Sequence, residues 1–310
     1  MATWQEEGLI GCVRKARAAA AMHAPIVIRG RRTARSVGAY FDLITRDGRL
    51  FYGDSFHLGY FSNGERSLDE ALTAHTDLVA GLARVETAEN VLDVGCGLAA
   101  PAIRIAQRYG CRVTGVNISR EQVRQGNELI SDRDLGDRVV VQRGDARALG
   151  FPDESFDAIV CLEAAGDICV TEADKSLLVS ELHRMLRPGG HVGFSDLALR
   201  TRLSPDDDRE LRAVLYHSAA ELVTDWPGIF SREGFRVVES HDIIVETMPT
   251  WEHVQALYQM RDDDVVRRYG RKLVDRTLAH LQRIASILAE HGTFPALAAQ
   301  KPLRSPAQQG

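Results

Sequence analysis

A short apolar run that ends in two glycines constrains this chain more than any other stretch. The segment Asn-Val-Leu-Asp-Val-Gly-Cys-Gly-Leu-Ala-Ala at 90–100 begins with apolar residues at 91–94, which predict a buried parallel strand. Gly95 and Gly97 follow at once, and Pro101 suits the first turn of a helix, where no backbone donor is needed. Glycines let the backbone turn sharply and let a ligand approach closely, and the free amides of the helix start face the same crevice. The segment therefore predicts a strand, a glycine turn and a helix around a bound ligand.

The glycine pattern by itself admits two kinds of nucleotide ligand. Gly95-x-Gly97-x-x-Ala100 also fits the fingerprint of NAD-binding proteins, which has an acidic residue about 20 positions further on to hold a ribose hydroxyl. Here the next predicted strand is followed by Asn117, which disfavours the dinucleotide interpretation. Asp93, at the end of the first strand, can accept hydrogen bonds from a cationic or hydroxylated ligand.

Four motifs carry a resemblance to a known family. Asp93-x-Gly95-x-Gly97 resembles motif I of class I S-adenosylmethionine (SAM)-dependent methyltransferases. Residues 113–117 resemble motif II, Gly144-Asp-Ala resembles the adenine-binding acidic turn, and Arg187-Pro-Gly-Gly resembles the loop before strand five. The resemblance implies an α/β, Rossmann-like fold with a seven-stranded, mostly parallel sheet and helices on both faces. It also implies an enzyme that uses SAM as its cofactor.

Further stretches narrow the resemblance to small-molecule enzymes. Residues 40–45, 51–61 and 67–72, together with Ser119-x-x-Gln122, resemble the subgroup of sterol and tocopherol C-methyltransferases, cyclopropane fatty-acid synthases and bacterial natural-product methyltransferases. The resemblance covers about residues 35–200 and is weaker beyond them.

The length of the chain suits one core with appended helices, since 310 residues are many for one core and few for two full domains. We predict a helical N-terminal cap at 1–85, a SAM-binding core at 86–200, the remainder of the core sheet with helical substrate-lid insertions (about 201–230 and 247–290) at 201–300, and a disordered tail at 301–310.

Composition and charge bound the partners. The net charge of −5 disfavours nucleic acid, which usually binds a basic face, and the Asn/Asp-Pro-Pro-aromatic tetrapeptide of base-methylating relatives is absent. Five cysteines without metal-ligand spacing indicate buried reduced thiols, a reducing compartment and no metal. We therefore expect a small-molecule substrate and no nucleic-acid partner.

The start of the chain indicates a cytoplasmic protein. The apolar run at 18–28 is interrupted by His23 and Pro25 and is too short to span a bilayer. Acidic residues at 6 and 7 precede it, which a secretory signal would avoid. A helix expected at 4–22 could pack on a neighbouring copy, so a homo-oligomer stays open.

Hydrophobic periodicity and the turn and capping residues predict the order of the helices and strands. Strands are expected at 90–94, 112–117, 139–141, 158–162, 191–194, 235–245 and 294–300, and helices at 4–22, 33–44, 68–83, 99–109, from Ser119 on, 171–186, 204–223 and within 251–290. The glycine- and aromatic-rich stretch 45–66 is expected to be a loop over the cofactor. Pro295 predicts that the last strand lies at an edge. Gln122 is expected to complete a capping box with Ser119.

Four polar residues end the predicted strands or directly follow them, namely Asp93, Asn117, Asp145 and Glu163. Open parallel sheets bind ligands beyond the carboxyl ends of their strands. These side chains should therefore lie on one rim, although they are far apart in sequence.

The resemblance assigns most cofactor contacts. They are Tyr52, Ser55, Asp93, Gly95, Gly97, Asn117, Ile118, Gln122, Asp145, Ala146 and Leu162. For Gln122 a capping role and a SAM contact are both open, and the two can coexist.

The chemistry points to three catalytic candidates, Glu163, His57 and Asp167. Methyl transfer from a sulfonium is an in-line displacement, in which the protein aligns donor and acceptor and excludes water. An oxygen or nitrogen acceptor usually also needs a base, whereas an alkene acceptor forms a carbocation that needs nearby negative charge or π faces and then a base. The resemblance places Glu163 beside the methyl site, with a ribose or N-cap contact as the structural alternative.

The loop after Glu163 departs from part of the subgroup. Several sugar O-methyltransferases keep this glutamate and add a His pair soon after it, but this chain has Ala-Ala-Gly-Asp at 164–167. The departure slightly favours carbon acceptors. By resemblance, His57 lies in a loop that contacts SAM and substrate, with backbone positioning as the alternative. His75 is expected to be a surface or packed residue.

Three functions remain open from the sequence. The first is a SAM-dependent methyltransferase for a small, largely apolar metabolite, such as a natural product or an isoprenoid-like alkene. The second is an O- or N-methyltransferase of the same subgroup acting on a phenol, sugar or amine. The third is a SAM-fold cyclase without methyl transfer.

Overall fold

A seven-stranded sheet forms the centre of the molecule in the computed structural model. The structure describes residues 33–62, 64, 67–215, 219–260, 263, 266–267 and 270–304, so the helix expected at 4–22 lies outside the described residues. The strand order is β3-β2-β1-β4-β5-β9-β7. The strands are β1 (Asn90–Val94), β2 (Arg112–Asn117), β3 (Val139–Arg143), β4 (Phe156–Leu162), β5 (Leu186–Ser195), β7 (Arg236–Asp242) and β9 (Pro295–Gln300). The first five of these run parallel, and β9 is antiparallel to β5 and β7.

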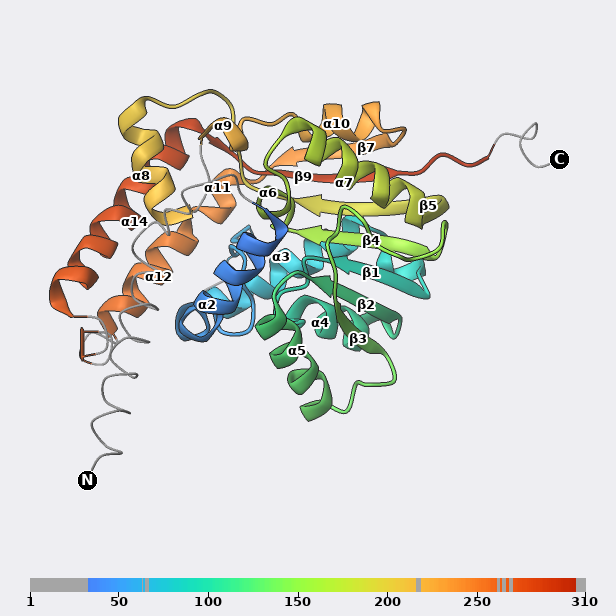
Figure 1. Ribbon diagram of the computed structural model, residues 1–310, viewed down its shortest axis with the longest axis horizontal. Helices are drawn as coiled ribbons and strands as arrows, with labels where there is room; N and C mark the ends of the chain where they lie inside the picture. Colours follow the sequence, from blue (N-terminus) through green and yellow to red (C-terminus); the bar gives the residue numbers. More distant parts are fainter. Residues whose placement is uncertain are drawn as a thin grey trace.

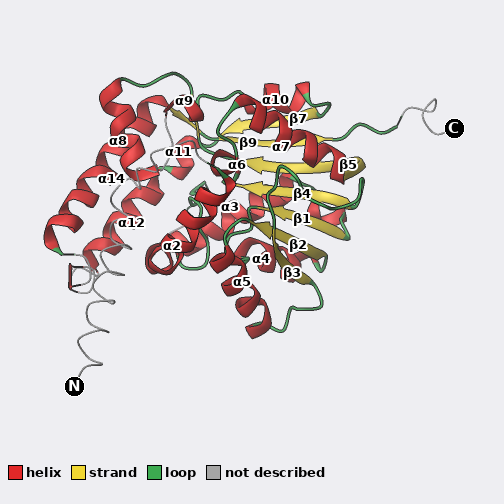
Figure 2. Ribbon diagram, in the orientation of Figure 1, coloured by secondary structure: helices red, strands yellow, loops and turns green. Residues whose placement is uncertain are grey.

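Helices cover both faces of the sheet, as Figure 2 shows. One face carries α3 (Leu68–Leu82), η1 (Val85–Thr87), α4 (Ala100–Tyr109) and α5 (Arg120–Asp132), and the other carries α6 (Ala165–Ile168), α7 (Glu172–Met185) and α10 (Trp226–Arg232). Successive side chains of β1 point to opposite faces of the sheet. Val91 packs in the apolar cluster with α3 and α4, whereas Leu92 packs in the cluster with α7 and α10. The predicted α/β, Rossmann-like fold is confirmed.

A further group of helices lies beyond the carboxyl ends of the parallel strands (Figure 1). These are α2 (Ala34–Tyr52), α8 (Pro205–Leu215), α9 (Ala219–Leu222), α11 (Ile244–Thr247), α12 (Pro249–Met260) and α14 (Arg271–His291), with a two-stranded sheet of β6 (Ala198–Leu199) and β8 (Gly292–Thr293). Trp251, Tyr258 and Ile284 are buried in their common apolar cluster, which we call the lid cluster. None of the described helices has an apolar stretch that could cross a membrane.

Helix α2 is longer than predicted. The loop expected at 45–66 begins only at Gly53, because α2 continues to Tyr52. The prediction relied on the glycine content of this stretch. One glycine inside a helix costs about 1 kcal/mol, which the packing of α2 against α5 and α12 outweighs.

The position of the last strand was also predicted wrongly. β9 lies inside the sheet, between β5 and β7, and the edge strand on that side is the exposed β7. Pro295 is tolerated because it is the first residue of the strand. Within the range 204–223 expected as a helix, the structure describes α8 to Leu215 and α9 from Ala219, and residues 216–218 lie outside the described residues.

Parts of the predicted N-terminal cap and of the predicted tail contact the core of the protein. Helix α3, expected in the N-terminal cap, packs on a face of the sheet: a Cβ on Gly193 of β5 would lie 2.0 Å from the carbonyl oxygen of Val79. The first residues of the expected tail are held as well, because Lys301 Nζ donates to the carbonyl oxygens of His183 and Leu186 at 2.9 Å. The boundaries of the four segments remain predictions.

Candidate active site

A pocket opens at the carboxyl ends of the parallel strands. It contains about 900 Å³ of space between atoms, its open mouth included, which is in the range of small-molecule sites. Its wall combines the glycine turn after β1, the ends of β2 and β4, the turn after β3, helices α2 and α6, and the loop 54–57. The rim predicted from four separated polar residues is confirmed, since Asp93, Asn117, Asp145 and Glu163 all line it.

The pocket brings together all the predicted site residues except Tyr52 and Ser55. The lining members are His57, Asp93, Gly95, Gly97, Asn117, Ile118, Gln122, Asp145, Ala146, Leu162, Glu163 and Asp167. Ser55 lines a neighbouring polar pocket with Arg49 and Arg104, and the side chain of Tyr52 lies outside the described part of the structure. The roles of all these residues remain predictions.

The glycine turn needs glycine for two different reasons. Gly95 has φ +77°, and a Cβ there would lie 2.2 Å from the Cβ of Ala164. Gly97 has φ +54°, and a Cβ there would meet no atom within 4 Å. The first glycine permits close packing inside the protein, and the second leaves open space.

Asp93 Oδ2 and Gln122 Nε2 are among the buried polar atoms of the pocket wall that lack a hydrogen-bond partner within the described structure. Asp93 is 2 % exposed, and its burial raises the pKa of the carboxyl to about 7. Leaving such a group unpaired costs about 1–3 kcal/mol, so both atoms suit a ligand that offers one donor and one acceptor. The amino, carboxylate and hydroxyl groups of SAM provide such partners, so the residues present fit this cofactor.

The start of α5 explains why Gln122 points its amide into the pocket. Ser119 Oγ accepts the backbone N–H of Gln122 at 3.0 Å, as predicted. However, the N–H of Ser119 donates to Asn117 Oδ1 at 2.9 Å, and Asn117 Nδ2 donates to Gln122 Oε1 at 2.8 Å. The prediction that Gln122 completes a capping box is therefore wrong, because Asn117 takes that place.

Asp145 is oriented by an arginine that the sequence analysis missed. Arg147 donates its backbone N–H to Asp145 Oδ1 at 3.1 Å and its Nη2 to Oδ2 at 2.8 Å. These hydrogen bonds hold the pKa of Asp145 below its usual range. Arg147 also reaches Asp174 at 2.9 Å, which fixes the turn after β3 against the start of α7. The i, i+2 spacing of Asp145 and Arg147 was the available signal.

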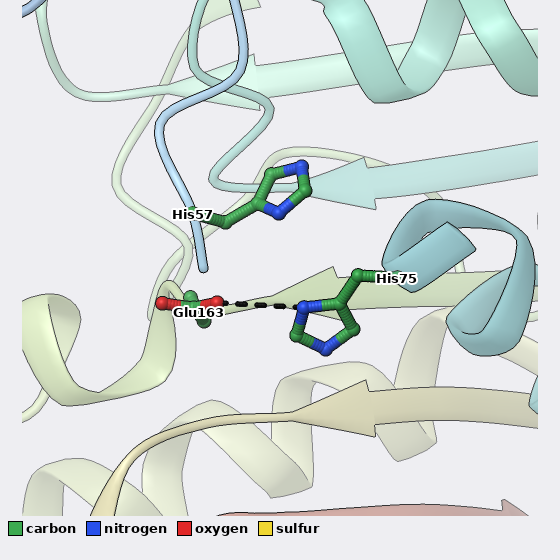
Figure 3. Close-up of side chains that lie close together, drawn as sticks. All are labelled: His57, His75 and Glu163. Carbon is green, nitrogen blue, oxygen red and sulfur yellow. Dashed lines mark ion pairs between the residues drawn. The ribbon is translucent and has the colours of Figure 1, made fainter. Parts of the chain in front are cut away.

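Glu163 directly follows β4, and its carboxylate points toward the ring of His75 (Figure 3). Its backbone has φ +51°, and its side chain is 15 % exposed. Oε1 accepts the backbone N–H of Leu58 at 2.6 Å and lies 3.6 Å from Nδ1 of His75. Burial raises the pKa of Glu163 well above its usual range; the Leu58 N–H opposes this shift, and Asp196 and Asp167 add to it.

Two histidines meet at the carbonyl oxygen of the same Leu58. His57 Nδ1 lies 2.9 Å and His75 Nδ1 lies 2.7 Å from this oxygen, which can only accept, so both nitrogens are the donors. Burial lowers the pKa of His57 to about 4 and that of His75 to about 3, so both rings are neutral at pH 7. His57 Nε2 is then a buried acceptor without a hydrogen-bond partner among the described residues.

The three side chains also have the composition of a metal site. His57, His75 and Glu163 offer ligand atoms within 4.8 Å of one another. Both Nδ1 atoms and Glu163 Oε1 already have hydrogen-bond partners on the backbone of Leu58, so these three atoms are satisfied without a cation. The absence of a metal remains a prediction.

Fold and pocket together define an α/β enzyme that holds a nucleoside ligand at the tips of a parallel sheet. Residues 91–190 match the family model described as "Methyltransferase domain". The chain is 30 % identical over 222 residues to 27-O-demethylrifamycin SV methyltransferase of Amycolatopsis mediterranei, covering 71 % of this chain and 80 % of that protein. It is 31 % identical over 249 residues to 2-methyl-6-phytyl-1,4-hydroquinone methyltransferase of Synechocystis, and the match covers 73 % of this chain and 74 % of that protein.

Among solved structures, the cyclase SpnF superposes with a TM-score of 0.73 at 25 % identity, covering 88 % of this chain and 98 % of SpnF. The resemblance found in the sequence is confirmed. This chain belongs to the class I SAM-dependent methyltransferases of the small-molecule subgroup, and SAM is its cofactor.

Proposed function

We propose that this methyltransferase transfers the methyl group of SAM to a small, largely apolar metabolite. One observation carries the proposal: the unpartnered Asp93 and Gln122 atoms and the buried Glu163 line one and the same pocket. Apolar side chains in the pocket wall, such as Val37, Phe41 and Ile168, support an apolar acceptor. The relatives named for a rifamycin compound and a phytyl hydroquinone support it as well.

In this proposal the rim holds the cofactor. Asp93, Gln122 and Asp145 would accept or donate hydrogen bonds to SAM, and Gly97 would leave room for it. The cofactor supplies a methyl group that its sulfonium already activates. The protein aligns the acceptor with that group and excludes water, which can contribute about 7–11 kcal/mol in well-oriented reactions.

Glu163, with His57 and Asp167, would serve the acceptor side. We keep the slight preference for carbon, because a buried carboxylate can stabilise a cationic intermediate and then remove its proton. The missing His pair after Glu163 favours carbon only weakly, because two imidazoles from other segments, His57 and His75, lie beside Glu163.

A second candidate is O- or N-methylation of a phenol, sugar or amine. His57 Nε2 favours it, because a neutral imidazole with its Nδ1 proton engaged can take the proton of a hydroxyl acceptor. A third candidate function is that of a cyclase without methyl transfer, and the similarity to the cyclase SpnF supports it.

Incubation with methyl-labelled SAM and a panel of prenyl and phenolic acceptors tests these functions. We expect label on carbon of an apolar acceptor. Label on oxygen or nitrogen would replace the first candidate by the second, and label that stays on SAM with every acceptor would favour the cyclase.

We also propose a small-molecule substrate without a nucleic-acid partner, because the net charge is −5. A cytoplasmic location is proposed because the described cysteines are free and buried. A homo-oligomer through residues 4–22 remains a proposal, and sedimentation of the full chain against a variant without these residues tests it.

Glu163→Gln is the sharpest test of the acceptor side. Glutamine keeps an oxygen that accepts the Leu58 N–H but removes the negative charge and the base. We expect SAM affinity within about threefold of the wild type and a turnover reduced by about 10²–10⁴. Calorimetry with SAM and single-turnover methyl transfer measure the two. Unchanged turnover would remove Glu163 from the catalytic residues.

A further inference from the structure

We propose that His75 is a positioning residue for methyl transfer, which acts on Glu163 by fixing the backbone of Leu58. The proposal rests on the catalytic role proposed for Glu163 above. His75 belongs to α3, which packs on the sheet, and no pattern in the sequence indicated that it would approach the active site.

The backbone of one residue, Leu58, connects the three side chains of Figure 3. The N–H of Leu58 donates to Glu163 Oε1 at 2.6 Å, and its carbonyl oxygen accepts from His75 Nδ1 at 2.7 Å and from His57 Nδ1 at 2.9 Å. The N–H and the carbonyl of Leu58 belong to two successive peptide groups, so the histidines act on this N–H through the position of the residue. By holding the carbonyl, they fix Leu58 where its N–H reaches Glu163.

Within this hydrogen-bonded group, His75 is the side chain that is anchored to the core. It is 0 % exposed, and its Nε2 accepts from the hydroxyl of Ser195 in β5 at 3.0 Å. Because both ring nitrogens have a partner on a different element, the ring has a single orientation. His57, by contrast, belongs to the same loop as Leu58 and cannot fix that loop to the core.

Neighbouring anchors hold the rest of the loop without touching Glu163. The N–H of Gly59 donates to Thr250 Oγ1 in α12 at 2.9 Å, and the N–H of Tyr60 donates to the carbonyl oxygen of Ala71 in α3 at 2.9 Å. Thr250 therefore offers a matched control for anchoring of the loop as such.

The charged groups that face Glu163 set the direction of the effect. Asp196 after β5 and Asp167 in α6 both raise the pKa of Glu163, burial raises it most, and His57 and His75 are neutral. The Leu58 N–H opposes this rise. A weaker hydrogen bond from the Leu58 N–H to Glu163 should therefore raise the pKa of Glu163. The acidic limb of the pH profile of kcat should then move to higher pH.

Two variants of His75 separate its two ring nitrogens. Asparagine places an amide donor near the position of Nδ1, whereas glutamine reaches the position of Nε2 and loses the donor to Leu58. We expect His75→Gln to lower kcat by about 10- to 100-fold, with KM for SAM unchanged within about threefold and the acidic limb shifted to higher pH. His75→Asn should keep kcat within about threefold and the wild-type limb.

The control and a second route keep the test decisive. Thr250→Val should lower the thermal midpoint without moving the limb. Should His75→Gln fail to fold, Ser195→Ala removes the donor to Nε2 and should move the limb in the same direction by less. All variants are assayed as the full chain, with an acceptor that the wild type methylates.

Three results would overturn the proposal. The first is a wild-type kcat and a wild-type acidic limb of its pH profile in His75→Gln or in Ser195→Ala. The second is an equal loss of kcat in His75→Asn and His75→Gln. The third is a wild-type activity that a chelator removes and a divalent ion restores. The last would make His57, His75 and Glu163 a metal site. An unchanged turnover in Glu163→Gln would instead refute the proposed function itself.

Discussion

At the scale of single residues, the turn after β1 decides what can bind. Gly95 lies against Ala164, which directly follows Glu163, so the glycine turn and the acceptor side share a contact. Gly97 borders open space in the same turn. Both have positive φ, where an L side chain costs about 1–2 kcal/mol. The two glycines therefore carry the same backbone cost and differ only in what a side chain would meet.

Alanine at each position separates the two roles. Gly97→Ala should lose about 1–2 kcal/mol of unfolding free energy and at least tenfold in SAM affinity, because the methyl group enters the ligand space. Gly95→Ala should lose more than about 3 kcal/mol, because its Cβ also meets Ala164. Urea unfolding and calorimetry with SAM check this pair, and equal stability of the two variants would contradict it.

At the scale of elements, α2 is a wall of the pocket. Ala34, Val37 and Phe41 line it, and the helix is tied to the start of α5. Asp42 Oδ1 accepts from Ser119 Oγ at 2.6 Å and from the backbone N–H of Glu121 at 3.0 Å. A carboxylate at a helix N-terminus is favourable, so this contact fixes α2 over the cofactor side.

Removing that contact should loosen the wall. We expect Asp42→Ala to lose about 1 kcal/mol of unfolding free energy and to release SAM several-fold faster. Glu128→Gln is the matched control, since it breaks only an exposed pair with Arg124 on the same α5, and such pairs contribute little. Stopped-flow dissociation of SAM measures the effect; equal off-rates for the two variants would show that α2 does not gate release.

At the scale of the whole molecule, the position of α3 links the core to the active site. Its C-terminal half packs so closely on β5 that Gly193 has room for hydrogen alone, and the same helix carries His75. This packing places His75 between the sheet and the Leu58 loop. The two layers and the lid helices are thus held in one arrangement by a helix that precedes the sheet in sequence.

A methyl group on Gly193 should disturb that arrangement. Its Cβ would lie 2.0 Å from the carbonyl oxygen of Val79 and 2.8 Å from the nitrogen of Ala83, both backbone atoms that cannot move alone. We expect Gly193→Ala to lose more than about 3 kcal/mol of unfolding free energy or to fail to fold. Gly81→Ala on α3 has no atom within 4 Å and should gain up to about 1 kcal/mol. Chemical denaturation of both variants tests the contrast.

The sequence alone determined the cofactor half of this protein. Strand, glycine turn and helix are local features with strong residue preferences, and parallel strands bring their carboxyl ends to one edge whatever the loops do. Asp93, Asn117, Asp145 and Glu163 could therefore be placed on one rim from their spacing, and the structure places them there.

Only the tertiary structure decided the rest. His75 reaches Glu163 because α3 packs on β5, and the side chain of Arg147 is fixed by its contact with Asp174 at the start of α7. The place of β9 inside the sheet likewise depends on its pairing with β5 and β7. Each of these outcomes depends on contacts between distant segments, and periodicity and spacing carry information on neighbours along the chain alone.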